Sequence, residues 1–168
     1  NYFDINEAGH VIAKPQQDSG AVVDLTDVIE EAKGRGLKLP LLIRFQDILR
    51  HRVESVNQAF RTSIREFEYK GSYRGVFPIK VNQLREVVEE ILDAGQCYQF
   101  GLEVGSKPEL FAGLALQSQV GSLIICNGYK DSAYIRMALM GLKLGKTVIL
   151  VVEKLEELSQ ILKVSRQV

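Results

Sequence analysis

A strand–helix repeat with a nearly constant period is the feature that most constrains the fold of this chain. Four apolar, strand-like runs begin 24, 23 and 25 residues apart, at 75–81, 99–104, 122–127 and 147–152. Each run is followed by one segment with helical spacing, at 84–94, 107–116, 131–144 and 154–163. Strands that alternate with helices in this way pair in parallel, through right-handed crossovers.

Two α/β architectures use such a repeat. A (β/α)8 barrel has a period of this size, because its eight units span about 200–250 residues. A doubly wound open sheet is the alternative, and it normally carries a glycine-rich phosphate turn after its first strand. Neither GxGxxG nor GxxxxGK[ST] occurs in the sequence. We therefore expect about the first half of a TIM-type (β/α)8 barrel, completed by chain beyond Val168 or by another chain, since half a barrel leaves open strand edges.

The first 38 residues lack the regular strand–helix repeat of the rest, and their pattern predicts a short N-terminal β/α arm. We expect strands at 2–5 and 10–13, a polar loop at 14–20, and a helix at 25–33 with Asp24 as its N-cap. The barrel part is then 39–168, truncated, and it begins with a short strand at 41–45 and a long helix at 47–69.

Composition excludes several classes of function. The 21 basic and 21 acidic residues cancel, so no charge excess indicates a nucleic acid or an anionic membrane as partner. No apolar run approaches the ~20 residues of a membrane span. Cys97 and Cys126 are the only cysteines, and neither has a Cys or His at metal-ligand spacing. We expect no zinc site, and two buried thiols in a reducing cytoplasm.

A polar side chain stands at the end of each of the four predicted barrel strands. These side chains are Lys80, Glu103, Asn127 and Glu153. Chemistry in such a barrel takes place where the strands end and the following loops begin, so we expect the four to converge on one rim. Turns are polar in any case, and each of these residues taken alone also fits an ordinary strand end.

Lys80 stands out because of its apolar neighbours. An ammonium group within such a run loses water, which favours the neutral amine, and a neutral amine attacks an aldehyde to form a Schiff base. The alternative is a surface lysine whose head group reaches water. Pro78 removes a ladder donor from the strand and predicts a bulge that redirects Lys80.

Several segments, in order and at matching spacing, closely resemble the biosynthetic arginine decarboxylases. This group belongs to the pyridoxal-phosphate enzymes with an alanine-racemase-like barrel. The segments are YFDIN at 2–6, GHV at 9–11, VFPIKVNQ at 76–83, GLEVGSKPEL at 101–110, ICNGYKD at 125–131 and VEK at 152–154. The chain is thus identified as similar to the N-terminal part of that family.

The resemblance implies a lyase that decarboxylates L-arginine to agmatine, on the route to putrescine and spermidine. It implies pyridoxal 5'-phosphate bound as a Schiff base on Lys80, magnesium as an associated ion, and a homo-oligomer, either a dimer or a tetramer. The arm 1–38 would belong to the family's β-domain or lead into the barrel. The cofactor would act as electron sink while the protein orients the bond to be broken.

The resemblance also assigns roles to two further residues. Glu103 matches an acidic position close to the lysine, where a carboxylate favours the protonated Schiff base. Asn127 would hydrogen-bond within the cofactor rim, although an Asn before Gly128 also fits a turn. We expect Lys107 and Lys130 to be solvated lysines at helix starts, and Asn82 and its neighbour Gln83 to cap the next helix.

Other parts of the family's site come from later sequence or from a partner subunit. They include the phosphate loop, the acid at the pyridine nitrogen and the substrate pocket, so we expect this chain alone to be inactive. Two other functions stay open from the residues themselves. One is a catalytically silent homologue that regulates by binding a protein, and the other is a different pyridoxal-phosphate barrel, such as diaminopimelate decarboxylase or a racemase.

Overall fold

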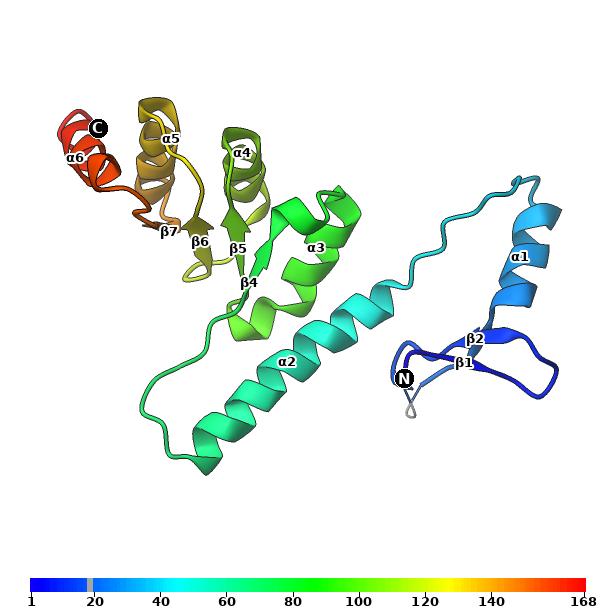
Figure 1. Ribbon diagram of the computed structural model, residues 1–168. Coiled ribbons are helices and arrows are strands. Elements are labelled where there is room, and N and C mark those ends of the chain that lie inside the picture. Colours follow the sequence, from blue (N-terminus) through cyan, green and yellow to red (C-terminus); the bar gives the residue numbers. More distant parts are fainter. Residues whose placement is uncertain (18–19) are drawn as a thin grey trace. The chain divides into compact units, whose positions relative to one another are not determined.

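The strand–helix repeat forms a four-stranded parallel sheet in the computed structural model, which describes residues 1–17 and 20–168. The strands pair in the order β4 (Val76–Pro78), β5 (Gly101–Val104), β6 (Leu123–Cys126) and β7 (Thr147–Leu150). The helices between and after them are α3 (Arg85–Ala94), α4 (Lys107–Leu116), α5 (Ser132–Lys143) and α6 (Leu155–Ser165). Figure 1 shows these helices following one another along the sheet. Sequential neighbours that pair in parallel are the arrangement of a partial TIM-type barrel, as the repeat predicted.

The predicted elements of this sheet are confirmed, with ends that differ by a few residues, while the strand expected at 41–45 is wrong. Residues 41–45 have no regular secondary structure, and helix α2 (Gln46–Glu66) begins directly after them. A short apolar run satisfies the strand pattern, but a strand also needs a paired neighbour. Among the described residues, β5 is the only partner of β4, so this run adds no strand to the sheet.

The described chain divides into two compact units, Asn1–Arg52 and Val53–Val168, with the boundary inside α2. The first unit holds an antiparallel sheet of β1 (Phe3–Ile5), β2 (Val11–Ala13) and β3 (Val23–Asp24), followed by α1 (Leu25–Gly34). The N-cap prediction is confirmed, because the Asp24 carboxylate accepts a hydrogen bond of 2.8 Å from the Thr26 N–H. Strand β3 was not predicted. Part of the loop expected at 14–20, residues 18–19, lies outside the described residues.

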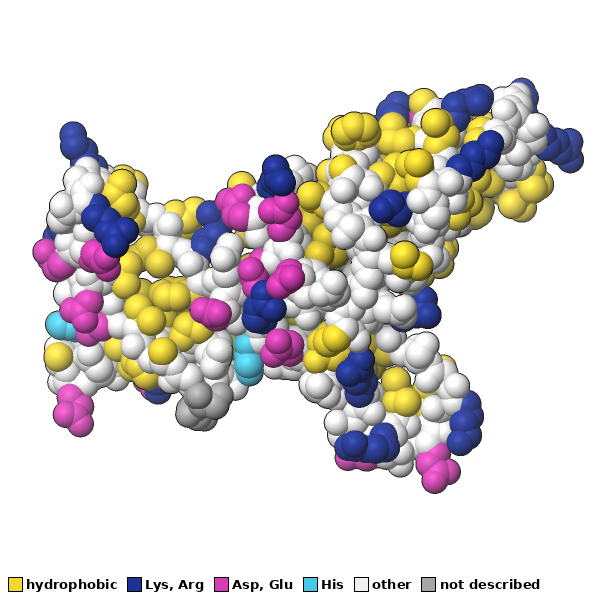
Figure 2. Space-filling view, turned by 180° about the vertical axis from the view of Figure 1, so that it is seen from behind, with side chains coloured by type: hydrophobic (Ala, Val, Ile, Leu, Met, Phe, Trp, Pro, Cys, Tyr) yellow, Lys and Arg dark blue, Asp and Glu magenta, His cyan; other side chains and the backbone are white. Residues whose placement is uncertain are grey.

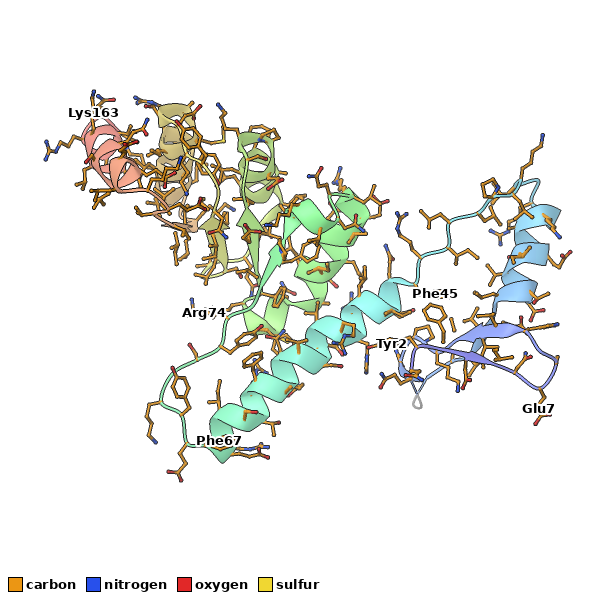
Figure 3. The ribbon with its side chains drawn as sticks, in the orientation of Figure 1. Tyr2, Glu7, Phe45, Phe67, Arg74 and Lys163 are labelled. Atoms are coloured by element: carbon orange, nitrogen blue, oxygen red, sulfur yellow. The ribbon has the colours of Figure 1, made fainter. Side chains whose placement is uncertain are left out.

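Aromatic contacts hold the first unit together around its first strand. The Tyr2 hydroxyl and the His51 Nδ1 are 2.7 Å apart, and Phe3 packs edge-on against Phe45 with ring centroids 6.2 Å apart. Figure 3 labels Tyr2 and Phe45, which lie close together within this unit.

The core of the second unit lies between the sheet and its helices. Leu102 and Val104 of β5 and Ile124 of β6 are fully buried, and they pack with Leu110 of α4 and Tyr134 of α5. Because side chains alternate along a strand, the residues between them face the other side of the sheet. This alternation places Glu103 on the face that would become the inside of a barrel.

The two thiols differ in exposure: Cys126 is buried in this core, whereas Cys97 is exposed, so the expectation of two buried cysteines is wrong for Cys97. Cys97 lies on the 3-10 turn before β5, outside the strand–helix layers. Burial raises the pKa of the Cys126 thiol, which keeps it protonated and unreactive.

Hydrophobic side chains are also exposed over the second unit, as Figure 2 shows. Phe67, just past the end of α2 (Figure 3), is 82% exposed. Phe60 of α2 stacks on Tyr73 at a centroid distance of 3.7 Å. No helix in the described part of the chain is both long and apolar enough to cross a membrane.

Gly101 provides a test of the sheet packing. A Cβ at this position would lie 2.2 Å from the Leu123 carbonyl oxygen of the neighbouring strand. Because that atom is backbone within a paired strand, we expect Gly101→Ala to lower the free energy of unfolding by about 1–3 kcal/mol, the usual cost of overpacking. Urea denaturation measures this change.

Gly34→Ala is the control, since a Cβ there meets no atom within 4 Å and the residue lies in helix α1. We expect it to be neutral or to stabilise by less than about 1 kcal/mol. Equal effects of the two substitutions would contradict the proposed close approach of β5 and β6.

Candidate functional site

Polar side chains from successive strand ends line one open cleft, with a cavity volume of about 530 Å³. Lys80 follows β4, Glu103 lies in β5, Asn127 follows β6 and Glu153 follows β7. All four border this cleft, together with Ser106 and Glu109 from the start of α4 and Gly105 and Gly128 from the loops. The structure therefore brings together the four strand-end residues that the sequence singled out.

Lys80 reaches the cleft from a single 3-10 turn, Ile79–Val81, and not from a strand. Strand β4 ends at Pro78, which still pairs with Glu103, so the bulge expected at the proline is a strand end instead. Ile79 takes the buried position in the core, and Lys80 next to it is exposed. The expectation of a desolvated Lys80 is therefore wrong for the described chain, because the turn directs this side chain into an open cleft.

The predicted cap of helix α3 is also different. Leu84 is the N-cap residue and makes no capping side-chain bond, while the Asn82 side chain accepts a hydrogen bond of 3.2 Å from the Leu84 N–H. Asn82 thus shapes the turn between Lys80 and α3, two residues before the N-cap Leu84.

Glu103 and Asn127 form a direct pair within the cleft. The Asn127 side-chain amide donates to Glu103 Oε1 at 2.9 Å. Glu103 is only 7% exposed, and Asn127 is held by its own N–H, which donates to the Val104 carbonyl at 2.9 Å. The strand alternation described above explains why Glu103 points to this side, and the pairing of β5 with β6 sets its distance from Asn127.

Two further glutamates accept hydrogen bonds from backbone N–H groups of the cleft loops. Glu109 accepts from the Gly105 N–H at 2.7 Å, and Glu153 accepts from the Gly128 N–H at 2.6 Å. Glu109 was not singled out from the sequence, although a signal was present. Ser106 and Glu109 have the spacing of a capping box, in which the glutamate turns back toward the start of the helix. Ser106 is indeed the N-cap of α4.

Of the two helix-start lysines, Lys130 contradicts the prediction, whereas Lys107 is exposed as expected. Lys130 is fully buried, and its ammonium donates to the Gly128 carbonyl at 2.6 Å, so the expectation of a solvated side chain is wrong. A buried carboxylate on α6, Glu157, makes this position tolerable for a cation. Lys107 is half-exposed and pairs with Asp131, the N-cap of α5, at 2.7 Å. Hydrogen bonds from Lys107 and from the Tyr134 N–H hold the pKa of Asp131 below its ordinary value.

The chemistry available in the cleft follows from these contacts. Lys80 is the one cationic side chain among the described lining residues, and it stands with Glu103, Glu109 and Glu153. The Lys80 amine is accessible to an aldehyde from the cleft, and the buried Glu103 carboxylate lines the same cleft. The N–H groups of Gly105 and Gly128 already donate to glutamates, so these two groups are not free to bind a phosphate.

Comparisons with known proteins agree with this geometry. The family model described as "Pyridoxal-dependent decarboxylase, pyridoxal binding domain" matches residues 53–168, which include the whole cleft. The chain therefore belongs to the pyridoxal-dependent decarboxylases, through their pyridoxal-binding domain.

Within this family the chain is similar to biosynthetic arginine decarboxylases, as its segments predicted. It is 49% identical to that of a Nostoc species over 99% of the chain, and 47% identical to that of Bacteroides thetaiotaomicron over 99%. These matches cover 24% and 26% of the two relatives, so the chain spans about a quarter of their length. The crystal structure of the biosynthetic arginine decarboxylase from Campylobacter jejuni superposes with a TM-score of 0.89 at 31% identity, over 99% of this chain and 28% of that one. This match supports the partial barrel.

The residues of the cleft fit one end of pyridoxal phosphate. Lys80 would offer an amine for its aldehyde, and Glu103 would offer a buried carboxylate in the same cleft. The Gly105 and Gly128 N–H groups are not free to hold its phosphate group, because both donate to glutamates. No group of three or more His, Cys, Asp or Glu side chains in the described residues could hold a metal ion.

Gly128 tests how tightly the cleft loops are packed. Its φ is +73°, and a Cβ would lie 2.6 Å from the Gly105 carbonyl oxygen. Gly145 is a matched control, since its φ is +78° and a Cβ there meets nothing within 4 Å. We expect Gly145→Ala to cost about 1–2 kcal/mol for the left-handed backbone. Gly128→Ala should cost about 1–3 kcal/mol more for the added backbone clash.

Unfolding by urea, measured for both variants, gives this difference directly. Identical losses would show that the loops after β5 and β6 are not in close contact.

Proposed function

We propose that the protein to which this chain belongs decarboxylates L-arginine to agmatine, with pyridoxal phosphate held covalently on Lys80. The observation that carries the proposal is the position of Lys80, which among the described residues is the one cation lining the cleft of a pyridoxal-binding domain. The relatives to which the chain is similar are biosynthetic arginine decarboxylases, which supports arginine as substrate over the substrates of racemases or of diaminopimelate decarboxylase. Agmatine then leads to putrescine and spermidine.

The bound cofactor would supply the electron sink for loss of carbon dioxide. Lys80 would anchor it at the end of β4, on a turn whose orientation is set by the buried Ile79. Glu103 would act on the nitrogen of that linkage, because a nearby carboxylate favours a positive charge there. Asn127 would keep Glu103 in place through the 2.9 Å hydrogen bond between them.

Other assignments belong to the same proposal. Residues 1–38 would be part of the β-domain or lead into the barrel, and residues 39–168 would be the first half of the barrel. The protein would work in the cytoplasm as a homo-oligomer, a dimer or a tetramer. Magnesium, where it is bound, would have ligands beyond the described residues, which contain no suitable cluster.

Labelling tests the role of Lys80. Borohydride reduction of the full-length protein with bound pyridoxal phosphate should fix the cofactor onto Lys80, as peptide mass spectrometry would show. Lys80→Ala should lower carbon dioxide release from arginine by several orders of magnitude, because a covalent catalyst is lost.

Lys107→Ala is the matched control, since Lys107 lies near the same strand ends but pairs with Asp131. It should keep activity close to that of the unmodified protein. The assignment fails if the label lies on another lysine, or if Lys80→Ala turns over arginine at the original rate.

Glu103→Gln tests the carboxylate without changing its shape. The amide oxygen still accepts from Asn127, but the negative charge is gone, so positive charge on the Lys80 linkage is less favoured. We expect the pH at which the visible band of the bound cofactor changes to move down. A pH titration of absorbance measures this, and an unchanged titration would remove Glu103 from the proposal.

A further inference from the structure

A buried pair of opposite charges contacts two of the loops that border the cleft. Lys130 is fully buried, Glu157 is 3% exposed, and the Lys130 Nζ is 3.6 Å from Glu157 Oε2. Removing two charges from water costs free energy that their attraction only partly returns, and a pair of apolar side chains is often as stable. Stability alone therefore gives a weak reason for charges at this position.

The carboxylate of Glu157 ties together two loops of the cleft. Oε1 accepts from the Lys130 N–H at 3.2 Å, in the loop after β6, and Oε2 accepts from the Glu153 N–H at 2.9 Å, in the loop after β7. The hydrogen bond from the Glu153 N–H is the main cause that holds the pKa of Glu157 below its ordinary value. A carboxylate has an oxygen for each of these donors, and an apolar side chain has none.

The ammonium of Lys130 continues the connection to the cleft lining. It donates to the Gly128 carbonyl at 2.6 Å, and the Gly128 N–H donates to the Glu153 side chain at 2.6 Å. Both backbone polar groups of Gly128 are therefore held: Lys130 donates to its carbonyl, and its N–H donates to Glu153. Asn127, which precedes Gly128, is the residue that holds Glu103.

We propose that Lys130 and Glu157 are positioning residues for the cofactor cleft: their buried pair holds the loops after β6 and β7 so that Asn127 and Glu153 face Lys80. The proposal rests on the function given above, because it assumes that this cleft is the site of the reaction. Neither residue lines the cleft itself. Their effect on the reaction passes through Gly128, Asn127 and Glu153.

An apolar replacement of the whole pair separates positioning from stability. Lys130→Met alone leaves Glu157 buried without its counter-charge, and it should unfold at clearly lower urea concentration. The double variant Lys130→Met with Glu157→Met removes both charges and should recover part of that loss, because the two backbone N–H groups that donate to Glu157 lose their acceptor. Its side chains make no hydrogen bond to the Gly128 carbonyl or to the backbone N–H groups of positions 130 and 153. We therefore expect kcat for arginine, at saturating pyridoxal phosphate, to stay at least tenfold below that of the unmodified full-length enzyme.

Two controls sharpen the experiment. Lys107→Met removes the exposed partner of Asp131 at the same end of the sheet, and it should change neither kcat nor the urea midpoint by much, since exposed ion pairs contribute little. Glu157→Asp keeps the charge near Lys130 but is one methylene shorter, so it reaches only one loop. We expect it to fold and still to lower kcat severalfold, with KM for arginine changed less than kcat.

The outcomes distinguish failure of the positioning role from failure of the proposed function. A stable double variant with the original kcat would overturn the positioning role, and so would a Glu157→Asp variant with unchanged kcat. If the double variant does not fold, the Glu157→Asp result decides. Borohydride labelling of the unmodified enzyme is independent of both: no label on Lys80 would reject the proposed function, whereas a labelled enzyme that is indifferent to these substitutions would reject only the positioning role.

Discussion

The alternation of side chains along β5 is the constraint on which the site depends. Leu102 and Val104 are fully buried against the helices. Glu103 lies between them in the strand, so its side chain faces the other side of the sheet. A shift by one residue would bury the carboxylate in the apolar core and expose two large apolar groups. The hydrophobic core therefore orients the acidic side chain, and the parallel pairing with β6 brings Asn127 within 2.9 Å of it.

The cleft is built from loops that are more constrained than their position at a strand end suggests. Each cleft glycine N–H is taken by a glutamate, and the loops after β5 and β6 approach so closely that only glycine fits at position 128. The Lys130–Glu157 pair connects the loops after β6 and β7 to α6. These contacts hold the loops that border the same cleft as the exposed Lys80. Well-held positions matter for catalysis because small displacements of reacting groups cost large factors in rate.

Particular residues show where sequence reasoning succeeded and where it did not. The strands and helices of the second unit were predicted because parallel strands and amphipathic helices leave periodic signals. The strand at 41–45 was wrong because pairing depends on a neighbour that the sequence does not name. Lys130 was misjudged because its counter-charge, Glu157, is 27 positions away on another helix. Glu109 was overlooked, although its capping-box spacing from Ser106 was available.

The sequence by itself determined the class of the fold, the order of its elements and the residues that stand at the strand ends, since these follow from local patterns of apolar and polar residues. It also carried the resemblance that the family match confirmed. Only the tertiary structure decided that Lys80 leaves the strand on a 3-10 turn into an open cleft, that Glu103 pairs with Asn127, and that Lys130 is buried with Glu157. These features depend on distances between segments far apart in the chain, and such distances arise only when the strands pair and the helices pack.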